Sequence, residues 1–597
     1  MSANDYQLIT KREELPGAIE ELSKHTVLGL DTETTALDPY AGNLRLIQLA
    51  SPDGVRIFDL KKITDGNNGD VSQRQALLAP LGELLAGARP VKVAHNAKFD
   101  AKWIKKHLGV ELGGLFDTLL ASQIISAGDT EERHGLEAVT SRYLNETIDK
   151  AAQLSDWSGE LSVAQLEYAA RDAAVLLPLR EKMIERLKAD DLIRCASLEF
   201  DCVMPVASLE LAGFYIDPAR WREQMAIVGK TRARLAEELQ EMLAIGTAQG
   251  LLFSGARVDI NLDSHTQLTT ALKNLGVPVP DSTRNWKLQP LAADYPVIAK
   301  LLEYRTVQKA MTSYGENILQ EINPATHRIH ADFKQIGAPT GRMACTNPNI
   351  QQVPHSIEYR RCFRAPEGRK LIISDYSQIE LRILADFTGD QGFIEAFNSG
   401  ADLHRVTAAQ VFNIPLDAVT AEQRSFAKRL NFGVVYGIGA QRFAMMTGLK
   451  LTEAEDILRR YFATYRALDQ WLRAAALQAV RERTAPRTVA GRLARFRFDS
   501  EDRQAVSLAQ RNGKNSPIQG SSADIIKRAL RLLHEELRAT NASVVNVVHD
   551  EIVVEADASE APQVGKAVER AMCAAGEEYV KRVPVKVETE IADEWVK

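Results

Sequence analysis

Residues 544–554 place the acidic pair Asp550-Glu551 between two runs of apolar, mostly β-branched residues. This pattern predicts two buried strands joined by a tight turn. A second apolar run, 371–373, is followed closely by Asp375. Because a buried carboxylate is unfavourable unless it is paired or metal-bound, these acids predict a divalent-metal site where the strands meet. The alternative is that each acid only caps a turn.

Between these strands lies a segment in which cationic and aromatic residues recur at every fourth position: Arg424, Lys428, Phe432 and Tyr436. On a helix this spacing puts all four on one stripe. The stripe begins cationic and becomes aromatic, which suits a nucleotide with its phosphates at one end and its base on the rings. The alternative is a half-exposed helix that packs its rings in the core. With the metal site, the stripe favours nucleotide polymerisation.

The N-terminal part contains a second group of acids. Asp31 and Glu33 end a strand-like run and, being two residues apart, face the same side. Asp100 and Asp172 lie in helix-like segments, and Tyr168 precedes Asp172 by one helical turn. Each pair alone is also typical of a helix cap or a solvated face. Together the four carboxylates predict a second metal site.

The chain of 597 residues is long enough for several domains, each with its own core. Strand-like and helix-like segments alternate in residues 1–187, which predicts an α/β domain. Amphipathic helices dominate 220–320, most clearly at 221–243, with a loop at 246–255. Strands and helices mix from about residue 328. The predicted fold class is therefore multidomain, α/β followed by α+β.

Composition narrows the class of protein. The net charge of −6 argues mildly against a nucleic-acid partner, although an acidic enzyme can carry a local basic track. The candidate track is Arg481, Arg483, Arg487, Arg492, Arg495, Arg497, Arg503, Arg511 and Lys514. The alternative is a solvated surface loop.

The cysteines and the N-terminal residues indicate in which cellular compartment the protein is expected. Five cysteines without metal-type spacing indicate free thiols in a reducing compartment. The chain shows no signal-peptide pattern and no run approaching the ~20 apolar residues of a membrane span. We therefore expect a cytoplasmic protein without a membrane partner.

Three of these segments resemble the motifs of family A DNA polymerases, of which the large fragment of bacterial DNA polymerase I is the type. They are 375–382, 424–437 and 549–551. Residues 340–342 with 347–351 resemble the primer–template contact region of the family, 511–524 its template-side helix, and 402–404 its nucleotide-contacting histidine. The resemblance covers nearly the whole chain.

The resemblance implies a right-hand fold of palm, fingers and thumb, preceded by a ribonuclease H-like 3′–5′ exonuclease domain. The implied bounds are 1–187 for the exonuclease domain, 188–327 for the thumb and a connecting palm segment, 328–395 for the first part of the palm, 396–528 for the fingers and 529–597 for the second part of the palm. The implied activity is template-directed DNA synthesis from dNTPs, with proofreading.

By resemblance, Asp375 and Asp550, with the backbone carbonyl of Tyr376, hold two Mg²⁺ ions, for which Mn²⁺ can substitute. Glu551 is expected to be a further catalytic carboxylate. Lys428 is expected to donate a proton to pyrophosphate.

The nucleotide and DNA contacts implied by the resemblance form two larger sets. Glu380 is expected to exclude a ribose 2′-hydroxyl, and Phe432 to discriminate against dideoxynucleotides. The nucleotide-binding set is Arg424, Lys428, Phe432, Tyr436, His404, Gln378 and Glu380. The DNA-binding set is Arg342, Asn349, Gln351, Arg511, Asn515, Gln519 and His549.

The N-terminal carboxylates resemble the exonuclease domains of the DNA polymerase I and ribonuclease D type. The resemblance implies that Asp31, Glu33, Asp100 and Asp172 hold two metal ions and that Tyr168 orients the attacking water. The expected substrate is a single-stranded 3′ end. Asp117, which is near this group in sequence, is interpreted as structural.

Two departures from the family pattern limit the comparison. The first acid stands at position 31, so we expect no 5′-nuclease domain. The segment after Pro354 lacks the usual pattern, so its contacts are not assigned. We expect a monomer that binds primer–template DNA. Two alternatives stay open: an exonuclease with a degenerate polymerase module, and a non-catalytic DNA clamp.

Overall fold

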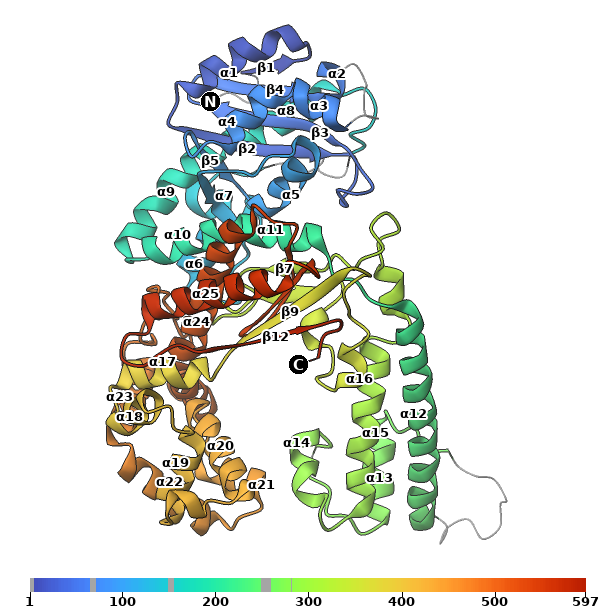
Figure 1. Cartoon of the computed structure of the whole chain (residues 1–597), viewed down its shortest axis with the longest axis vertical. Helices are drawn as coiled ribbons and strands as arrows, with labels where there is room; N and C mark the ends of the chain where they lie inside the picture. The colour runs from blue at the N-terminus through green and yellow to red at the C-terminus, as the bar shows by residue number, and fades with distance from the viewer. Residues whose placement is uncertain (1–4, 65–70, 149–154, 248–258, 281, 597) are drawn as a thin grey trace.

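The computed structural model describes residues 5–64, 71–148, 155–247, 259–280 and 282–596. Most of the loop expected at 246–255 lies outside these residues. Figure 1 shows an α/β domain above a central sheet, with two helical arms below that sheet on opposite sides. This arrangement confirms the predicted fold class.

The N-terminal domain is built on a six-stranded sheet of order β1-β4-β3-β2-β5-β6. Its strands are β1 (Tyr6–Ile9), β2 (Val27–Thr34), β3 (Leu44–Ser51), β4 (Gly54–Asp59), β5 (Val91–Ala94) and β6 (Leu115–Asp117). β2 pairs antiparallel with β3 and parallel with β5. Every residue of β3 is buried because helices cover both faces of the sheet.

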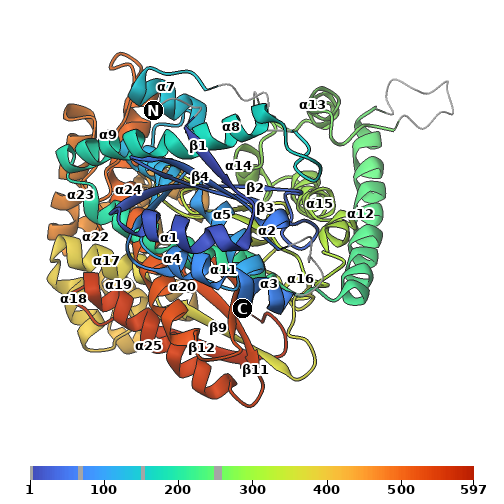
Figure 2. The same ribbon diagram turned by 90° about the horizontal axis from the view of Figure 1, so that it is seen from above.

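The helices of this domain are η1 (Arg12–Glu14), α1 (Leu15–Ser23), α2 (Leu60–Ile63), α3 (Val71–Leu77), α4 (Ala79–Ala86), α5 (Ala97–Leu108), α6 (Thr118–Ser126), α7 (Leu136–Leu144), α8 (Val163–Ala174) and α9 (Leu176–Ala189). α1, α4 and α5 pack on one face of the sheet and α8 on the other, as Figure 2 shows from above. The sheet thus presents the end of β2 between α5 and α8, the two helices that carry the other predicted acids.

The right-hand arm in Figure 1 is the predicted thumb. Its long helix α12 (Pro218–Thr247) packs against α15 (Pro296–Ser313) through leucines at helical spacing. The other helices between residues 188 and 327 are α13 (His265–Asn274), α14 (Asn285–Leu288), η3 (Gln289–Leu291) and η4 (Asn317–Glu321), together with α10 (Ile193–Asp201) and α11 (Val203–Ala212), which lie between the N-terminal domain and the central sheet.

The central sheet has the order β10-β11-β9-β12 and is entirely antiparallel. Its strands are β9 (Arg369–Tyr376), β10 (Ser543–Val548), β11 (Glu551–Asp557) and β12 (Val587–Ala592). α25 (Ala561–Tyr579) packs on it, and the small pair β7 (Asp332–Lys334) and β8 (Ala344–Thr346), η5 (Ile350–Gln352) and α16 (Ile357–Arg360) precede it. The predicted hairpin, in which two apolar strands flank the acidic pair Asp550-Glu551, is confirmed.

The left-hand arm holds α17 (Ile379–Thr388), which lies within the predicted first part of the palm. The arm also holds the helices of the predicted fingers: α18 (Gln391–Asn398), α19 (Leu403–Phe412), η6 (Leu416–Ala418), α20 (Ala421–Val435), α21 (Ala440–Thr447), α22 (Leu451–Thr464), α23 (Arg466–Arg481) and α24 (Arg503–Leu537). α24 runs without interruption from the arm into the region beside the central sheet, with Pro517 inside it. The domain bounds expected at 187, 395 and 528 therefore each fall inside a helix.

A fully buried charge cluster joins the connecting helix α10 to the polymerase region. Glu199 forms ion pairs with Arg492 and Lys527, and Arg492 also pairs with Asp524 at 2.9 Å. The Lys527 ammonium donates to the carbonyl oxygen of Gly341 at 2.7 Å. Since each buried charge has a partner, the cluster connects α10, the loop that carries Arg492, and the helix that carries Asp524 and Lys527.

Candidate active sites

The acidic ends of β9 and β11 lie side by side. Asp375 is directly opposite Glu551 in the strand register, and the Tyr376 N–H donates to the Asp550 carbonyl oxygen at 3.2 Å. Burial and then the charge of Asp375 raise the pKa of Asp550 to about 7. The structure therefore brings the two predicted metal-binding aspartates to one edge of the sheet.

The residues that follow Asp375 turn the chain into α17. The Tyr376 ring is buried, and its hydroxyl donates to the Met572 carbonyl at 2.6 Å, so its backbone is the part left for a metal. Gln378 has φ 57°, a left-handed conformation that ends the strand. α17 can then start at Ile379 and place Glu380 in its first turn.

The Glu551 carboxylate is held by two residues that sequence reasoning missed. The Trp595 indole N–H donates to Oε1 at 2.8 Å, and Nη1 of Arg360 lies 3.7 Å from Oε2. Both residues are buried. Arg360 comes from the segment after Pro354, whose contacts the sequence left unassigned.

The predicted cationic and aromatic stripe lies on α20. A capping box at Thr420 starts the helix, and Arg424 pairs with the carboxylate of Asp402. Lys428 is exposed and Phe432 half-buried. Tyr436 stands one position beyond the last helical residue, with 43% of its surface exposed. The stripe is therefore accessible along its length.

Glu380 links the stripe to the predicted DNA-contact loop. Its carboxylate accepts a hydrogen bond from the Tyr436 hydroxyl at 3.0 Å and pairs with Arg342. Glu380 is itself buried. Three residues expected to act on nucleotide and DNA thus form one connected group.

His404 is buried beneath the same helix. Its Nδ1 lies 3.0 Å from the side-chain nitrogen of Asn431, and its ring lies 5.8 Å from that of Phe432. Burial lowers the pKa of His404 to about 4. The imidazole is therefore neutral at physiological pH, and its Nε2 is the nitrogen free to face a phosphate.

The predicted DNA-contact residues come from three places. Asn349 and Gln351 lie at η5, where the Gln351 amide donates to the Val547 carbonyl at 2.9 Å. His549 occupies the β10–β11 turn with φ 55°. Arg511, Asn515 and Gln519 share one face of α24, and the Asn515 amide donates to the Tyr436 carbonyl at 3.4 Å. The last contact connects the template-side helix to the stripe.

Much of the expected basic track faces protein. Arg487 donates to the backbone of Asp190 and Asp191, Arg495 pairs with Asp190, and Arg497 pairs with Asp129 at 2.9 Å. These arginines dock the loop after α23 onto the N-terminal domain. Arg495 and Arg497 thus have carboxylate partners and Arg487 has carbonyl partners, and the interpretation of the track as a DNA-binding surface stays a prediction.

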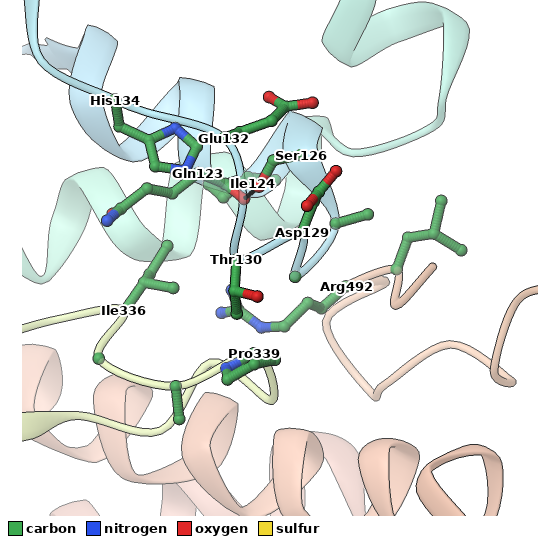
Figure 3. Close-up of a pocket in the computed structure, with 15 residues that line it drawn as sticks. Gln123, Ile124, Ser126, Asp129, Thr130, Glu132, His134, Ile336, Pro339 and Arg492 are labelled. Carbon is green, nitrogen blue, oxygen red and sulfur yellow. Dashed lines mark hydrogen bonds between the residues drawn. The ribbon is translucent and has the colours of Figure 1, made fainter. Parts of the chain in front are cut away.

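A cavity of about 210 Å³ lies at this junction (Figure 3). Its walls come from α6 and the loop after it, from residues 336–339, and from Arg492 and Leu493. None of the predicted site residues lines it. The cavity belongs to the domain junction rather than to either candidate active site.

The N-terminal acids converge from three elements. Asp31 and Glu33 lie within β2, Asp100 on α5, and Asp172 with Tyr168 on α8. Burial and the neighbouring carboxylates raise the pKa of Asp31 well above its usual range and that of Glu33 to about 9. The four acids are therefore close enough to repel one another, as a shared metal site requires.

Three smaller features complete this site. Burial and then the charge of Asp172 raise the pKa of Tyr168, which keeps the hydroxyl protonated. Asn96 precedes α5 in a left-handed conformation. Asp117 caps α6 and also accepts from the Asn96 and Ala97 amides, in line with the structural role expected for it.

Both groups of acids have the chemistry of a hard-cation site. Clustered carboxylate oxygens are the ligands that Mg²⁺ and Mn²⁺ prefer, and a cation would relieve the repulsion that raises these pKa values. In the described parts of the chain no set of three or more His, Cys, Asp or Glu is already drawn into a tight ligand shell. The chemistry of the donor set therefore fits a hard divalent cation.

Removing divalent metal should make the stability of the protein depend on pH. The folded-state pKa values of Asp100 and Asp550 are about 7 and that of Glu33 about 9, above the unfolded-state values of about 4. Their contribution to stability is therefore fully present below about pH 4 and is lost as pH rises, up to about pH 7 for Asp100 and Asp550 and up to about pH 9 for Glu33. In EDTA we expect Tm to fall across this window, and Mg²⁺ to restore it at pH 8.

Thermal melting of the E33Q protein is the control, and its decline should be shallower above about pH 7 because Glu33, whose pKa is about 9, no longer titrates there. A wild-type Tm in EDTA that is flat from pH 6 to pH 9, or insensitive to Mg²⁺, would contradict the expectation.

Comparison with known proteins agrees with this geometry. Residues 229–597 match the family model for DNA polymerase family A, and residues 6–188 match that for 3′-5′ exonuclease. DNA polymerase I of Aquifex aeolicus is 32% identical over 99% of this chain and 100% of its own length. DNA polymerase I of Pseudomonas aeruginosa is 29% identical over 99% of this chain, which spans 66% of that protein.

A solved structure is similar over almost the same extent. The polymerase domain of Pol1 from M. smegmatis, in complex with DNA primer-template and dNTP, superposes with a TM-score of 0.84 at 26% identity and covers 99% of both chains. An α/β exonuclease domain followed by a right-hand polymerase fold, each with its own carboxylate site, defines an enzyme that both extends and trims DNA. The chain belongs to DNA polymerase family A, and it is a DNA polymerase with a proofreading 3′–5′ exonuclease domain.

In the described parts of the chain, no helix is both long and apolar enough to cross a membrane.

Proposed function

We propose that this polymerase adds dNTPs to a primer 3′ end with two Mg²⁺ ions held by Asp375, Asp550 and the Tyr376 carbonyl. The observation that carries the proposal is the strand register that sets Asp375 opposite the Asp550-Glu551 turn. Bound there, the ions supply Lewis-acid activation of the 3′-hydroxyl and neutralisation of the leaving pyrophosphate. Mn²⁺ has the same ligand preference and is expected to substitute.

The protein side of the reaction is carried by the stripe on α20. Lys428, exposed in the middle of the stripe, is positioned to bind the triphosphate and to give a proton to pyrophosphate. Arg424 and the neutral His404 hold the phosphates by hydrogen bonds. Phe432 and Tyr436 offer their rings to the base. Gln378 is assigned to the nucleotide site because it precedes Glu380 at the start of α17.

The DNA partner is inferred from the chemistry around the site and from the M. smegmatis structure, which holds DNA primer-template and dNTP. We assign DNA contacts to Arg342, Asn349, Gln351, Arg511, Asn515, Gln519 and His549. At the second site Asp31, Glu33, Asp100 and Asp172 hold two metal ions, and Tyr168 orients water for attack on a single-stranded 3′ end.

The finer organisation is part of the same proposal. We retain the domain bounds 1–187, 188–327, 328–395, 396–528 and 529–597 as functional units, although helices run across three of them. The protein is proposed to act as a monomer in the cytoplasm. Size-exclusion chromatography with light scattering on the full chain tests the monomer.

Replacing Glu380 with alanine should admit ribonucleotides. Glu380 is buried between Arg342 and Tyr436, so its loss leaves room for a 2′-hydroxyl. We expect the ratio of kcat/KM for a dNTP to that for the matching NTP to fall by about 10²-fold. Single-nucleotide extension with dCTP and CTP measures it. E395A, on the exposed face of neighbouring α18, is the control, and an unchanged ratio in E380A would contradict the assignment.

The proposal as a whole is tested with a 5′-labelled primer–template that has a mismatched 3′ end, in Mg²⁺ and all four dNTPs. Trimming followed by full extension is the expected result. Trimming without extension would indicate a degenerate polymerase site, and extension that keeps the mismatch a silent exonuclease site. DNA binding in EDTA without any reaction in Mg²⁺ would indicate a clamp.

A further inference from the structure

A compact group of buried side chains lies next to the metal-binding edge of the palm and has no role so far. Trp595 donates its indole N–H to Glu551 at 2.8 Å. The guanidinium of Arg360 lies 4.1 Å from the centre of the Trp595 ring and 3.7 Å from Glu551. Trp595 is 0% exposed, Arg360 3% and Glu551 6%.

The strand register places the Glu551 carboxylate next to a second carboxylate, and Arg360 and Trp595 compensate for the resulting repulsion. Glu551 and Asp375 are directly opposite on antiparallel strands, so their side chains leave the sheet on the same face. Two like charges in that relation repel. Arg360 carries the nearby positive charge that acts on both Glu551 and Asp375. Arg360 and the Trp595 N–H together bind the Glu551 carboxylate, so that Asp375 remains available to bind a metal ion.

Trp595 is itself rigidly held. Its backbone N–H donates to the Phe363 carbonyl at 2.9 Å, and its ring packs against Phe214 and Phe363 with centroids 5.9 Å away. Arg360 is fixed in turn by a 2.8 Å contact between Nη2 and Nδ1 of His355. A donor fixed in this way can hold the Glu551 carboxylate in one orientation.

We propose that Trp595 and Arg360 are positioning residues of the polymerase site, which act through Glu551 to keep the Asp375–Asp550 edge in its productive geometry. The inference rests on the proposed function of that edge. Glu551 is in this view an oriented anion behind the metal ligands, and the C-terminal segment after β12 and the segment after Pro354 contribute to catalysis without touching substrate.

The alternative is that Trp595 only fills the core, and Trp221 is a tryptophan with that purely structural role. Trp221 is also 0% exposed, and its indole N–H donates to the Gly315 carbonyl at 2.7 Å. It packs in the same aromatic core, beside Phe363. Trp221 and Trp595 therefore differ in what accepts their N–H, a neutral carbonyl in one case and a catalytic-edge carboxylate in the other.

The first test compares W595F with W221F, since each keeps a ring and loses one N–H donor. Single-turnover extension by one nucleotide gives the rate constant and the apparent dNTP affinity. We expect W595F to lower the rate constant by about tenfold, because small displacements of catalytic groups carry large rate penalties. The dNTP affinity, also measured without chemistry on a dideoxy-terminated primer, should change by less than about twofold, with exonuclease activity unchanged.

W221F should lose comparable thermal stability but keep its extension rate within about twofold. The second test is a double-variant cycle with E551Q. If Trp595 acts through Glu551, the W595F/E551Q protein extends no more slowly than E551Q alone. The same cycle read from urea unfolding in EDTA should be non-additive, which is a readout that needs neither metal nor turnover.

Three outcomes would overturn the inference: W595F no slower than W221F, multiplied rate losses in the double variant, or additive unfolding free energies. R360K, which keeps the charge but loses the planar stack, serves if W595F fails to fold, and it should also slow extension with dNTP affinity preserved. If the wild-type protein does not extend primers, the proposed function fails instead, and the unfolding cycle still decides whether Trp595 and Glu551 are coupled.

Discussion

The D550N protein should extend primers about 10³-fold more slowly than the wild type, because loss of one metal-binding carboxylate removes several kcal/mol of transition-state stabilisation. Asparagine keeps the shape of the side chain. Burial and the nearby Asp375 raise the pKa of Asp550 to about 7, so the neutral amide should not weaken the fold. Single-turnover extension measures the loss, and exonuclease activity on single-stranded DNA should be retained.

D557N is the matched control for this experiment. Asp557 ends the same strand, β11, and pairs with Arg369 at 2.6 Å, at the opposite end of the strand from Glu551. Its replacement should leave extension unchanged. A D550N protein within tenfold of wild type would mean that the catalytic edge lies elsewhere.

The second large effect is expected at the other site. D31N should lower exonuclease activity by about 10³-fold while primer extension stays at the wild-type rate. Burial and three neighbouring carboxylates raise the pKa of Asp31 well above its usual range, so the substitution relieves repulsion in the metal-free fold. The assay is release of nucleotides from a labelled single strand, followed by extension of a mismatched primer.

For D31N the control is D53N, at a carboxylate that is 76% exposed and lies beside His25. It should trim like wild type. If the D31N protein removes the mismatch before it extends the primer, Asp31 is not required for exonuclease activity.

Much of this arrangement was readable in the sequence because the relevant signals are local. The acids at 31, 375 and 550 follow apolar runs that form buried strands, and residues 424 to 436 repeat at the helical period. Such periodicities fix which side of an element a residue occupies. They place Asp375 near the end of a strand and Asp550 in the turn between two strands, and the register of β9 with β11 then follows from burial of one face.

What the sequence missed depends on contacts between distant segments. Nothing near Trp595 signals that its indole reaches Glu551, 44 positions away. Nor does the local sequence reveal that the arginines at 487, 495 and 497 contact residues 129, 190 and 191, about 300 or more positions earlier in the chain. β12 was also not foreseen, because its alternating exposure lacks a continuous apolar run.

The buried cluster of Glu199, Arg492, Asp524 and Lys527 bears on how this enzyme can be recombined with its relatives. A chimera whose junction lies after α10, so that α10 is exchanged together with the exonuclease domain, would leave Arg492 and Lys527 facing foreign partners or none. An uncompensated buried charge is strongly destabilising. The transferable unit is therefore not a contiguous stretch of chain: it includes α10 and the arginine-rich loop some 290 residues downstream, which must be exchanged together.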